Sequence, residues 1–449
     1  MDTENARSIS NRLYTIHPSR KQQVSKDEYT LRHFHKNLAY IYATQRNDPD
    51  PEKLLESMKE RYIWYRKSWR GLPGKAIKQQ VGGDYVNQFK TPPLSIDLEI
   101  AAICNLACPF CFRQWIATPD KIMDSELAFG LIDQAAELGV PSIKFNWRGE
   151  PMMHPKLPQL IKYAKKKGIL ETLINTNATF LDQAAANKLI EAGLDTLIYS
   201  FDGGTEKTYH NMRPGRFKDN SFSAVFENIK RFALLKKEKG APFPFTKIQM
   251  VLTDEAFPEQ EQYYQLFSDY VDEVTTAAYM ERGGNLPVLQ PEDRASLVAA
   301  LPNDRSNLDD IQYWKETDGT LYLETGRLPC EQPFQRLMVS YDGRVFMCCI
   351  DWGNEHPLGY VTDKFFTKGD TDYTSVLERA QKNKKGYELM DLTMPERYTN
   401  PKKVVRTLGE IWNGREINSI RERHVRGKLE SIPICKKCTF KDTYAWKQV

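Results

Sequence analysis

Three cysteines stand close together in the run Cys104-Asn-Leu-Ala-Cys108-Pro-Phe-Cys111, directly after an alternating apolar segment at 94–100 that predicts a strand. Thiolates at this spacing suit a soft metal ion or an iron–sulfur cluster. Structural zinc prefers four closed ligands and usually pairs CxxC units. A [4Fe-4S] cluster held by three cysteines keeps one iron open for another ligand, so the spacing favours a cluster over zinc.

A second motif, Gly149-Glu150-Pro151, follows the next predicted strand at 141–147. Glycine would let the chain approach a ligand, and Glu150 supplies an acceptor for a cationic amine. Together with the cysteines, this motif resembles the radical SAM superfamily, whose cluster reduces S-adenosylmethionine (SAM) to methionine and a 5'-deoxyadenosyl radical. The family's segment reads "GGEP", and this chain departs from it because Arg148 replaces the first glycine.

The resemblance extends to further strand ends and assigns SAM contacts residue by residue. It implies that Gly149 and Glu150 bind the SAM ammonium and that Arg213 pairs with the SAM carboxylate, a role suited to a bidentate guanidinium. Asn and Ser also commonly close strand ends by bonding backbone, which is the structural alternative. The other positions carried over are Asn177 in a "TNG"-like segment, Ser200 in an "SIDG"-like segment near the ribose or carboxylate, and Phe110 near the adenine.

The last third of the chain holds a second cysteine set, Cys330, Cys348, Cys349 and the pair Cys435-Lys-Lys-Cys438. Four soft ligands in this arrangement suit zinc or a second iron–sulfur cluster. The segments around them, including an Asp-Gly turn before Cys348, resemble the SPASM/twitch extension of radical SAM enzymes. That resemblance implies one auxiliary [4Fe-4S] cluster on Cys330, Cys348, Cys435 and Cys438, in the shortened twitch form.

Cys349 is left over from both sets. It could be a buried core thiol, an alternative ligand to Cys348, or a donor of hydrogen to a substrate radical. Because neighbouring side chains on a strand point to opposite faces, we expect that Cys349 need not face the barrel mouth. We expect the second cluster to take an electron from the substrate.

Strand and helix patterns alternate from about 94 to 290, which is the signature of parallel β/α units. The resemblance makes this region an incomplete (β/α)6 radical SAM barrel (domain 91–290), whose chemistry lies at the carboxyl ends of the strands. A helical N-terminal extension (1–90) precedes it, and a small SPASM/twitch-like iron–sulfur domain (291–449) follows, with an insertion around 362–405. The predicted strands lie near 94–101, 141–147, 170–176, 195–201, 246–252 and 273–280, and the predicted helices at 125–138, 155–167, 181–192 and 222–239.

The extension carries one well-marked helix, with Asp50 as its cap, Pro51 at its first position and Gly71 as its stop. Its apolar stripe predicts a helix that packs on the barrel. The stripe consists of Leu55, Met58, Tyr62, Tyr65 and Trp69, and the opposite face carries Lys59, Arg61, Arg66, Lys67 and Arg70.

Composition narrows the functional class. The 63 basic and 59 acidic residues give a net charge of +4, which is too balanced to indicate a nucleic-acid partner. No secretory signal or apolar run long enough to span a bilayer is present, so a cytoplasmic enzyme is expected.

The resemblance implies a one-electron donor such as flavodoxin or ferredoxin, and abstraction of hydrogen from an unactivated C–H bond. A small polar substrate such as a sugar, nucleotide sugar or cyclitol, oxidised or rearranged, is our first expectation. A peptide or protein side-chain maturase, a redox-neutral sugar epimerase and a noncatalytic scaffold are the alternatives.

Overall fold

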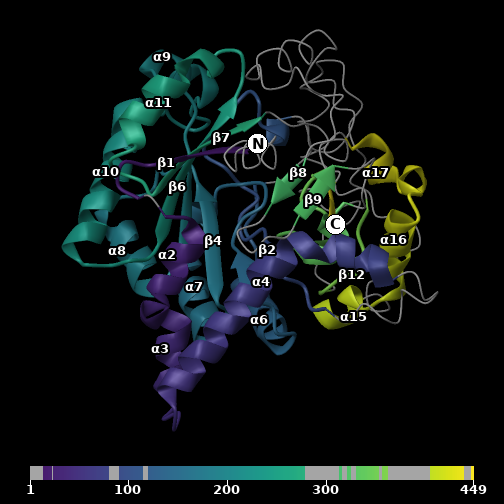
Figure 1. Cartoon of the computed structure of the whole chain (residues 1–449). Helices are drawn as coiled ribbons and strands as arrows, with labels where there is room; N and C mark the ends of the chain where they lie inside the picture. The colour runs from purple at the N-terminus through teal and green to yellow at the C-terminus, as the bar shows by residue number, and fades with distance from the viewer. Residues whose placement is uncertain are drawn as a thin grey trace.

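The computed structural model describes residues 14–22, 24–79, 91–114, 120–278, 313–315, 321–324, 330–352, 356–362, 405–438 and 446–448. A ten-stranded sheet in the order β1-β7-β6-β5-β4-β3-β2-β10-β11-β12 runs through the molecule (Figure 1). Its six parallel central strands form the barrel, and strands from both ends of the chain extend it. A separate three-stranded sheet has the order β13-β9-β8.

The barrel has the predicted β/α alternation, and each predicted strand and helix is confirmed within a few residues. Neighbouring strands pair in parallel from β2 to β7, which brings their carboxyl ends to one edge. The strands are β2 (Ser95–Leu98), β3 (Ser142–Lys144), β4 (Glu171–Thr176), β5 (Thr196–Ser200), β6 (Phe245–Leu252) and β7 (Glu273–Ala278). The helices around them are α6 (Ser125–Glu137), α7 (Leu157–Lys166), α8 (Gln183–Ala192), α9 (Glu206–Met212), α10 (Phe222–Glu238) and α11 (Gln260–Phe267).

Polar caps fix where these helices begin. The Asp124 side chain accepts from the first backbone N–H groups of α6, and Asp182 and Ser221 do the same for α8 and α10. Gly193 ends α8 in the left-handed region, at φ 79°. Short 3-10 turns occupy Phe34–Lys36, Phe112–Gln114, Pro151–Met153, Phe257–Glu259 and Leu429–Ser431.

The N-terminal extension differs from its predicted all-helical form. It contains helices α2 (Lys26–Arg32), α3 (Leu38–Thr44) and α4 (Pro51–Gln79), but also strand β1 (Tyr14–Pro18), which pairs antiparallel with edge strand β7. The helical description of the extension is therefore incomplete, because β1 was not predicted. Five residues that pair with a partner strand distant in sequence leave little local signal.

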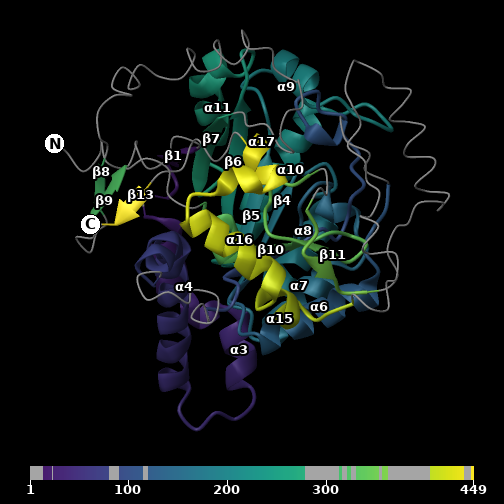
Figure 2. The same cartoon turned by 90° about the vertical axis from the view of Figure 1, so that its right-hand side faces the viewer.

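Helix α4 does not stop at Gly71 but continues to Gln79. Pro73 removes the backbone donor that would reach the Trp69 carbonyl, and the Gln335 side chain donates to that carbonyl instead. The predicted apolar stripe is confirmed: Met58, Tyr62 and Tyr65 are buried in the core, and the flanking Leu55 and Trp69 are packed against it. α4 thereby links the base of the barrel to the C-terminal region (Figures 1 and 2).

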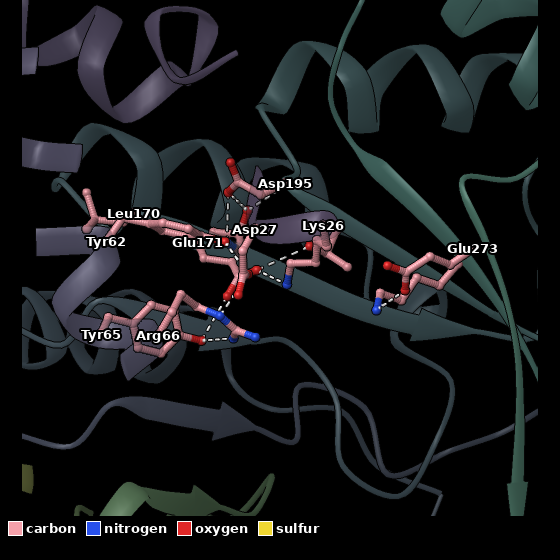
Figure 3. Close-up of polar contacts among 12 residues, drawn as sticks. Lys26, Asp27, Tyr62, Tyr65, Arg66, Leu170, Glu171, Asp195 and Glu273 are labelled. Carbon is pink, nitrogen blue, oxygen red and sulfur yellow. Dashed lines mark hydrogen bonds and ion pairs between the residues drawn. The ribbon is translucent and has the colours of Figure 1, made fainter. Parts of the chain in front are cut away.

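Buried charges join the extension to the amino ends of the barrel strands (Figure 3). Glu171, at the start of β4, pairs with Lys26 and accepts from the Tyr65 hydroxyl at 2.8 Å. Arg66, predicted to lie on the outer face of α4, instead pairs with Asp27 at 2.9 Å. This network lies at the amino ends of the strands, opposite the predicted site.

The C-terminal region attaches to the barrel through strand β10 (Arg336–Val339), which pairs in parallel with β2. Figure 2 shows the C-terminal helices crossing in front of the sheet. The remaining elements are α13 (Gln332–Gln335), β11 (Arg344–Phe346), β12 (Gly359–Tyr360), α15 (Leu408–Trp412), α16 (Arg415–Val425) and α17 (Pro433–Lys437), with β8 (Tyr313–Lys315), β9 (Leu321–Glu324) and β13 (Trp446–Gln448) in the small sheet. Most of the predicted insertion at 362–405 lies outside the described residues.

Candidate active site

A cavity of about 460 Å³ opens at the carboxyl ends of the barrel strands and extends to the C-terminal region. It brings together most residues predicted to form the site. Those that line it are Cys104, Cys108, Phe110, Cys111, Gly149, Glu150, Asn177, Ser200, Arg213 and Cys349.

Cys104, Cys108 and Cys111 converge at one end of this cavity on a loop after β2. The backbone N–H of Cys111 donates to the Cys108 carbonyl at 3.0 Å, which holds the loop in a tight turn. Burial raises the pKa of Cys104 to about 11 and raises the pKa of Cys108 further. Thiols in such surroundings become thiolates readily only when a cation binds them, and their convergence on a cavity fits a three-cysteine cluster.

Gly149 has a structural reason in addition to the predicted contact with a ligand. A Cβ at Gly149 would lie 2.2 Å from the Ala101 carbonyl oxygen and 2.5 Å from that of Ile103. The glycine therefore permits close packing on the cysteine loop, because any side chain would collide with backbone. The Glu150 backbone N–H donates to the Ile103 carbonyl at 2.8 Å, which ties the two loops together.

The Glu150 carboxylate lies buried and accepts from three donors. Thr176 Oγ1 lies at 2.7 Å, the backbone N–H of Asn177 at 2.8 Å and that of Met152 at 3.1 Å. Burial raises the pKa of Glu150 above its ordinary value, although these donors oppose the shift. The arrangement fixes an acceptor in the cavity, as the binding of an ammonium group requires.

Arg213 and Phe110 lie side by side in the cavity. Asp202 holds the Arg213 guanidinium through contacts of 2.6 Å to Nε and 2.5 Å to Nη2, and the guanidinium lies 5.7 Å from the Phe110 ring centre. Asn177 donates to the Asn105 side chain at 2.9 Å, beside Cys104. An arginine anchored on one edge by a carboxylate presents its other edge to an anion, as the predicted SAM contact requires.

The auxiliary cysteines gather behind this cavity. Cys348 follows the hairpin of β10 and β11, whose turn contains Gly343 in the left-handed region at φ 86°. Neighbouring thiols contribute to the raised pKa of Cys330 and of Cys348, which places Cys330, Cys348, Cys435 and Cys438 near one another. Within the described part of the chain, no three His, Cys, Asp or Glu side chains converge tightly enough for a single metal ion.

His424 is a member of this group that sequence reasoning missed. It is buried on α16, and its Nε2 lies 3.4 Å from Cys435 Sγ. Partners of ligating groups orient them and tune a bound metal. A lone histidine on a helix carries no spacing signal, so only the structure reveals the contact.

Cys349 lines the cavity, whereas Cys348 lies behind it. The expectation that Cys349 need not face the barrel mouth used strand alternation, but β11 ends at Phe346, so both cysteines lie after the strand and Cys349 lines the cavity. The Cys349 thiol also contacts that of Cys348. It is therefore within reach of both the cavity and the auxiliary cysteines.

Much of the remaining cavity lining is polar and was not predicted. Polar residues on alternate inward positions of the strands, against apolar neighbours, were the available signal. Two of them, Asp97 and Arg336, form an ion pair of 3.3 Å, and Arg336 lies 4.5 Å from the Trp69 ring centre. The polar lining comprises Asp97, Lys144, Asn146, Asn175, Gln249, Glu331, Gln332 and Arg336.

Fold and site define an α/β barrel enzyme with a three-cysteine site at its mouth and a second cysteine set beside it. Comparison with known families agrees: residues 98–259 match the radical SAM superfamily, and residues 330–368 match the iron-sulfur cluster-binding domain called SPASM. Residues 98–259 therefore form a radical SAM domain, and residues 330–368 belong to a SPASM-type domain. These domains imply SAM, a [4Fe-4S] cluster that binds it and further iron–sulfur binding in the C-terminal region.

Curated relatives are varied. The chain is 29% identical over 268 residues to the tungsten-containing aldehyde ferredoxin oxidoreductase cofactor-modifying protein of Pyrococcus furiosus, covering 56% of this chain and 69% of that protein. It is 34% identical over 117 residues to the PqqA peptide cyclase of Gluconobacter oxydans, covering 26% of this chain and 32% of the cyclase. The structure of BtrN with AdoMet and 2-DOIA has a TM-score of 0.41 at 16% identity, covering 77% of this chain and 92% of BtrN.

No helix in the described residues is long and apolar enough to span a membrane.

Proposed function

We propose that this enzyme oxidises a small, hydroxyl-bearing substrate held against the polar wall of the cavity. In this proposal Cys104, Cys108 and Cys111 hold the SAM cluster, and Gly149, Glu150, Asn177, Ser200, Arg213 and Phe110 surround SAM. When bound, the cluster reduces SAM and thereby supplies a radical that removes hydrogen from the substrate. The chain binds both reactants and excludes water from them.

The observation that carries the proposal is a set of unpaired polar atoms on residues that line the cavity. Asn175 Oδ1, Gln332 Oε1 and Arg336 Nε are buried and have no hydrogen-bond partner. Buried polar atoms are nearly always paired, so these three favour a ligand that supplies partners. Two acceptors and one donor suit hydroxyl groups, which both donate and accept.

In this proposal an aromatic group beside the cavity excludes water from the reactants. Phe112, Trp147, Phe346 and Trp352 form a separate apolar cluster with Met338. Cys111 and Cys349 both pack against it. Such a wall protects reactive intermediates from solvent and side reactions.

Oxidation requires an electron acceptor, and the auxiliary cysteines offer a place for one beside the cavity. Cys330, Cys348, Cys435 and Cys438 would hold a cluster that takes an electron from the substrate. Redox-neutral epimerisation would instead use Cys349 as a hydrogen donor. Solvent deuterium at an inverted carbon of the product, lost in Cys349→Ala, would establish epimerisation, whereas oxidation leaves the Cys349→Ala variant with much of its turnover.

A peptide or protein side-chain maturase is the second candidate. It is favoured by the likeness to a PqqA peptide cyclase, which covers only a third of that protein. In either case we propose a soluble one-electron donor such as flavodoxin or ferredoxin and a cytoplasmic location.

One experiment separates these candidates. Anaerobically reconstituted protein would be incubated with SAM and either the low-mass or the protein fraction of a cell extract, and 5'-deoxyadenosine would be measured. We expect stimulation by the low-mass fraction, with loss of that stimulation but normal SAM binding in Arg336→Leu. Stimulation by the protein fraction alone would favour the maturase.

A further inference from the structure

Arg148, the residue that replaces a glycine of the family motif, is buried and donates to three oxygen atoms at once. Its Nε and Nη2 donate to the two carboxylate oxygens of Glu99 at 2.6 and 2.7 Å. Its Nη1 donates to the backbone carbonyl of Trp352 at 2.8 Å. Glu99 also accepts from the backbone N–H of Tyr341 at 3.2 Å, in the turn of the hairpin that leads to Cys348.

The residue before it makes a second connection to the same loop. Trp147 Nε1 donates to the Cys349 carbonyl at 2.9 Å, and the Arg148 guanidinium stacks over the Trp147 ring at 4.6 Å. Two consecutive side chains thus hold the backbone of residues 348–352, which we term the auxiliary loop. Both contacts go to carbonyl groups, so they depend on the position of that backbone and not on its side chains.

The next two residues contact the opposite partner. Gly149 lies against the carbonyl oxygens of Ala101 and Ile103, where a Cβ would not fit, and the Glu150 backbone N–H donates to Ile103. The turn 147–150 is therefore fixed between the cysteine loop on one side and the auxiliary loop on the other. A displacement of the turn cannot occur without movement of one neighbour.

We propose that Arg148 is a positioning residue that couples occupancy of the SAM site to the order of the auxiliary loop. Because Gly149 and Glu150 face the cavity, a ligand held there immobilises the turn, and Arg148 with Trp147 transmits this to residues 348–352. The coupling is reciprocal, as any linkage between two binding equilibria must be. The inference rests on the SAM contact at Glu150 but not on the identity of the substrate.

Lysine cannot replace arginine in this role. One ammonium group can neutralise Glu99, but it lacks the planar fork that reaches Glu99 and the Trp352 carbonyl together. Arg148→Lys therefore keeps the charge and breaks the bridge. Trp147→Phe removes only the N–H that reaches Cys349.

The test is hydrogen exchange of the auxiliary-loop amides in the fully reconstituted, oxidised protein, with and without SAM. In the natural protein we expect SAM to slow exchange at 348–352 by about fivefold or more, the lower end for coupled sites. Arg148→Lys and Trp147→Phe should retain their iron and bind SAM, yet lose this protection. Arg344→Lys is the matched control, because it disturbs a buried pair with Asp342 inside the hairpin that does not contact the turn.

Three results would overturn the proposal: no protection by SAM in the natural protein, full protection in Arg148→Lys, or an equal loss in Arg344→Lys, which would indicate general loosening. If Arg148→Lys does not assemble its iron, Trp147→Phe decides the question, because it removes one hydrogen bond and retains an aromatic ring. Failure of the substrate proposal would leave these outcomes unchanged, since no substrate is present.

Discussion

In the proposed function Glu150 combines a structural and a binding role, and its protonation should therefore be visible in SAM affinity. Its carboxylate must be ionised to pair with an ammonium group, and burial raises its pKa above the ordinary value. Affinity for SAM should thus fall as pH decreases through this raised pKa. Glu150→Gln should weaken binding by about 1.5 to 3 kcal/mol, the range for a hydrogen bond to a charged group, and abolish this pH dependence.

Titration of SAM binding at several pH values measures both effects. Glu259→Gln is a suitable control, because Glu259 also accepts from backbone N–H groups, at Gly204 and Thr205, but does not line the cavity. An unchanged SAM affinity in Glu150→Gln would show that the motif binds SAM in another way.

Replacing cysteines set by set tests the two cluster sites separately. Two [4Fe-4S] clusters require about eight irons per chain. Replacement of Cys104, Cys108 and Cys111 by Ala should leave about four irons per chain and abolish SAM cleavage. Replacement of Cys330 and Cys438 should also leave about four irons, which are then those of the SAM cluster. Zinc together with only four irons in the natural protein would contradict the auxiliary cluster.

The motifs and the polar wall differ in how far sequence predicts them. Cys104, Cys108 and Cys111 lie within one loop, so their spacing along the chain reports their geometry directly. The partner of Arg148 is Glu99, and the partner of Asp97 is Arg336. Each of these pairs joins segments that are distant in the sequence, and single-sequence patterns contain no information on which strands and loops become neighbours.

Among the elements, the barrel strands and helices were predictable because each follows a local period. Strand β1 and the end of α4 were not, because tertiary pairing with β7 and the side chain of Gln335 determine them. The buried charge network of Lys26, Asp27, Tyr65, Arg66 and Glu171, which we term the base network, also depends on contacts between distant segments. It yields a prediction about how the extension is held.

Glu171→Gln should destabilise the fold by about 3 to 5 kcal/mol, because it leaves Lys26 buried without its anion. The lysine and arginine beside it hold the pKa of Glu171 below its ordinary value. The stabilisation is therefore present above the unfolded-state pKa and is lost as pH falls through the depressed folded-state pKa. Denaturant unfolding at neutral and acidic pH measures both.

Glu28→Gln provides the comparison, because Glu28 forms an exposed pair with Arg32 on the same extension. Surface pairs of this kind contribute little, so its unfolding free energy should change by less than about 1 kcal/mol. Equal effects of the two substitutions would refute a special role for the base network.

At the scale of the whole molecule, the barrel and the C-terminal region share one sheet. Removal of everything after residue 329 would leave β2 as an unprotected edge, since β10 covers it. We expect such a chain to aggregate in size-exclusion chromatography, whereas a chain that ends at residue 438 and retains β10 should remain dispersed. A monomeric, cooperatively unfolding 1–329 chain would contradict this.

The pairing of β2 with β10 also has a consequence for biosynthesis. Ser95 emerges from the ribosome long before its partner Arg336. The edge of β2 in the nascent barrel therefore stays unpaired while most of the remaining chain is translated. Contacts between such distant segments slow folding and prolong the exposure of unpaired, aggregation-prone strand edges. Production of active enzyme should therefore depend on chaperones that shield β2, and on cluster insertion at Cys104, Cys108 and Cys111 during this interval or after it.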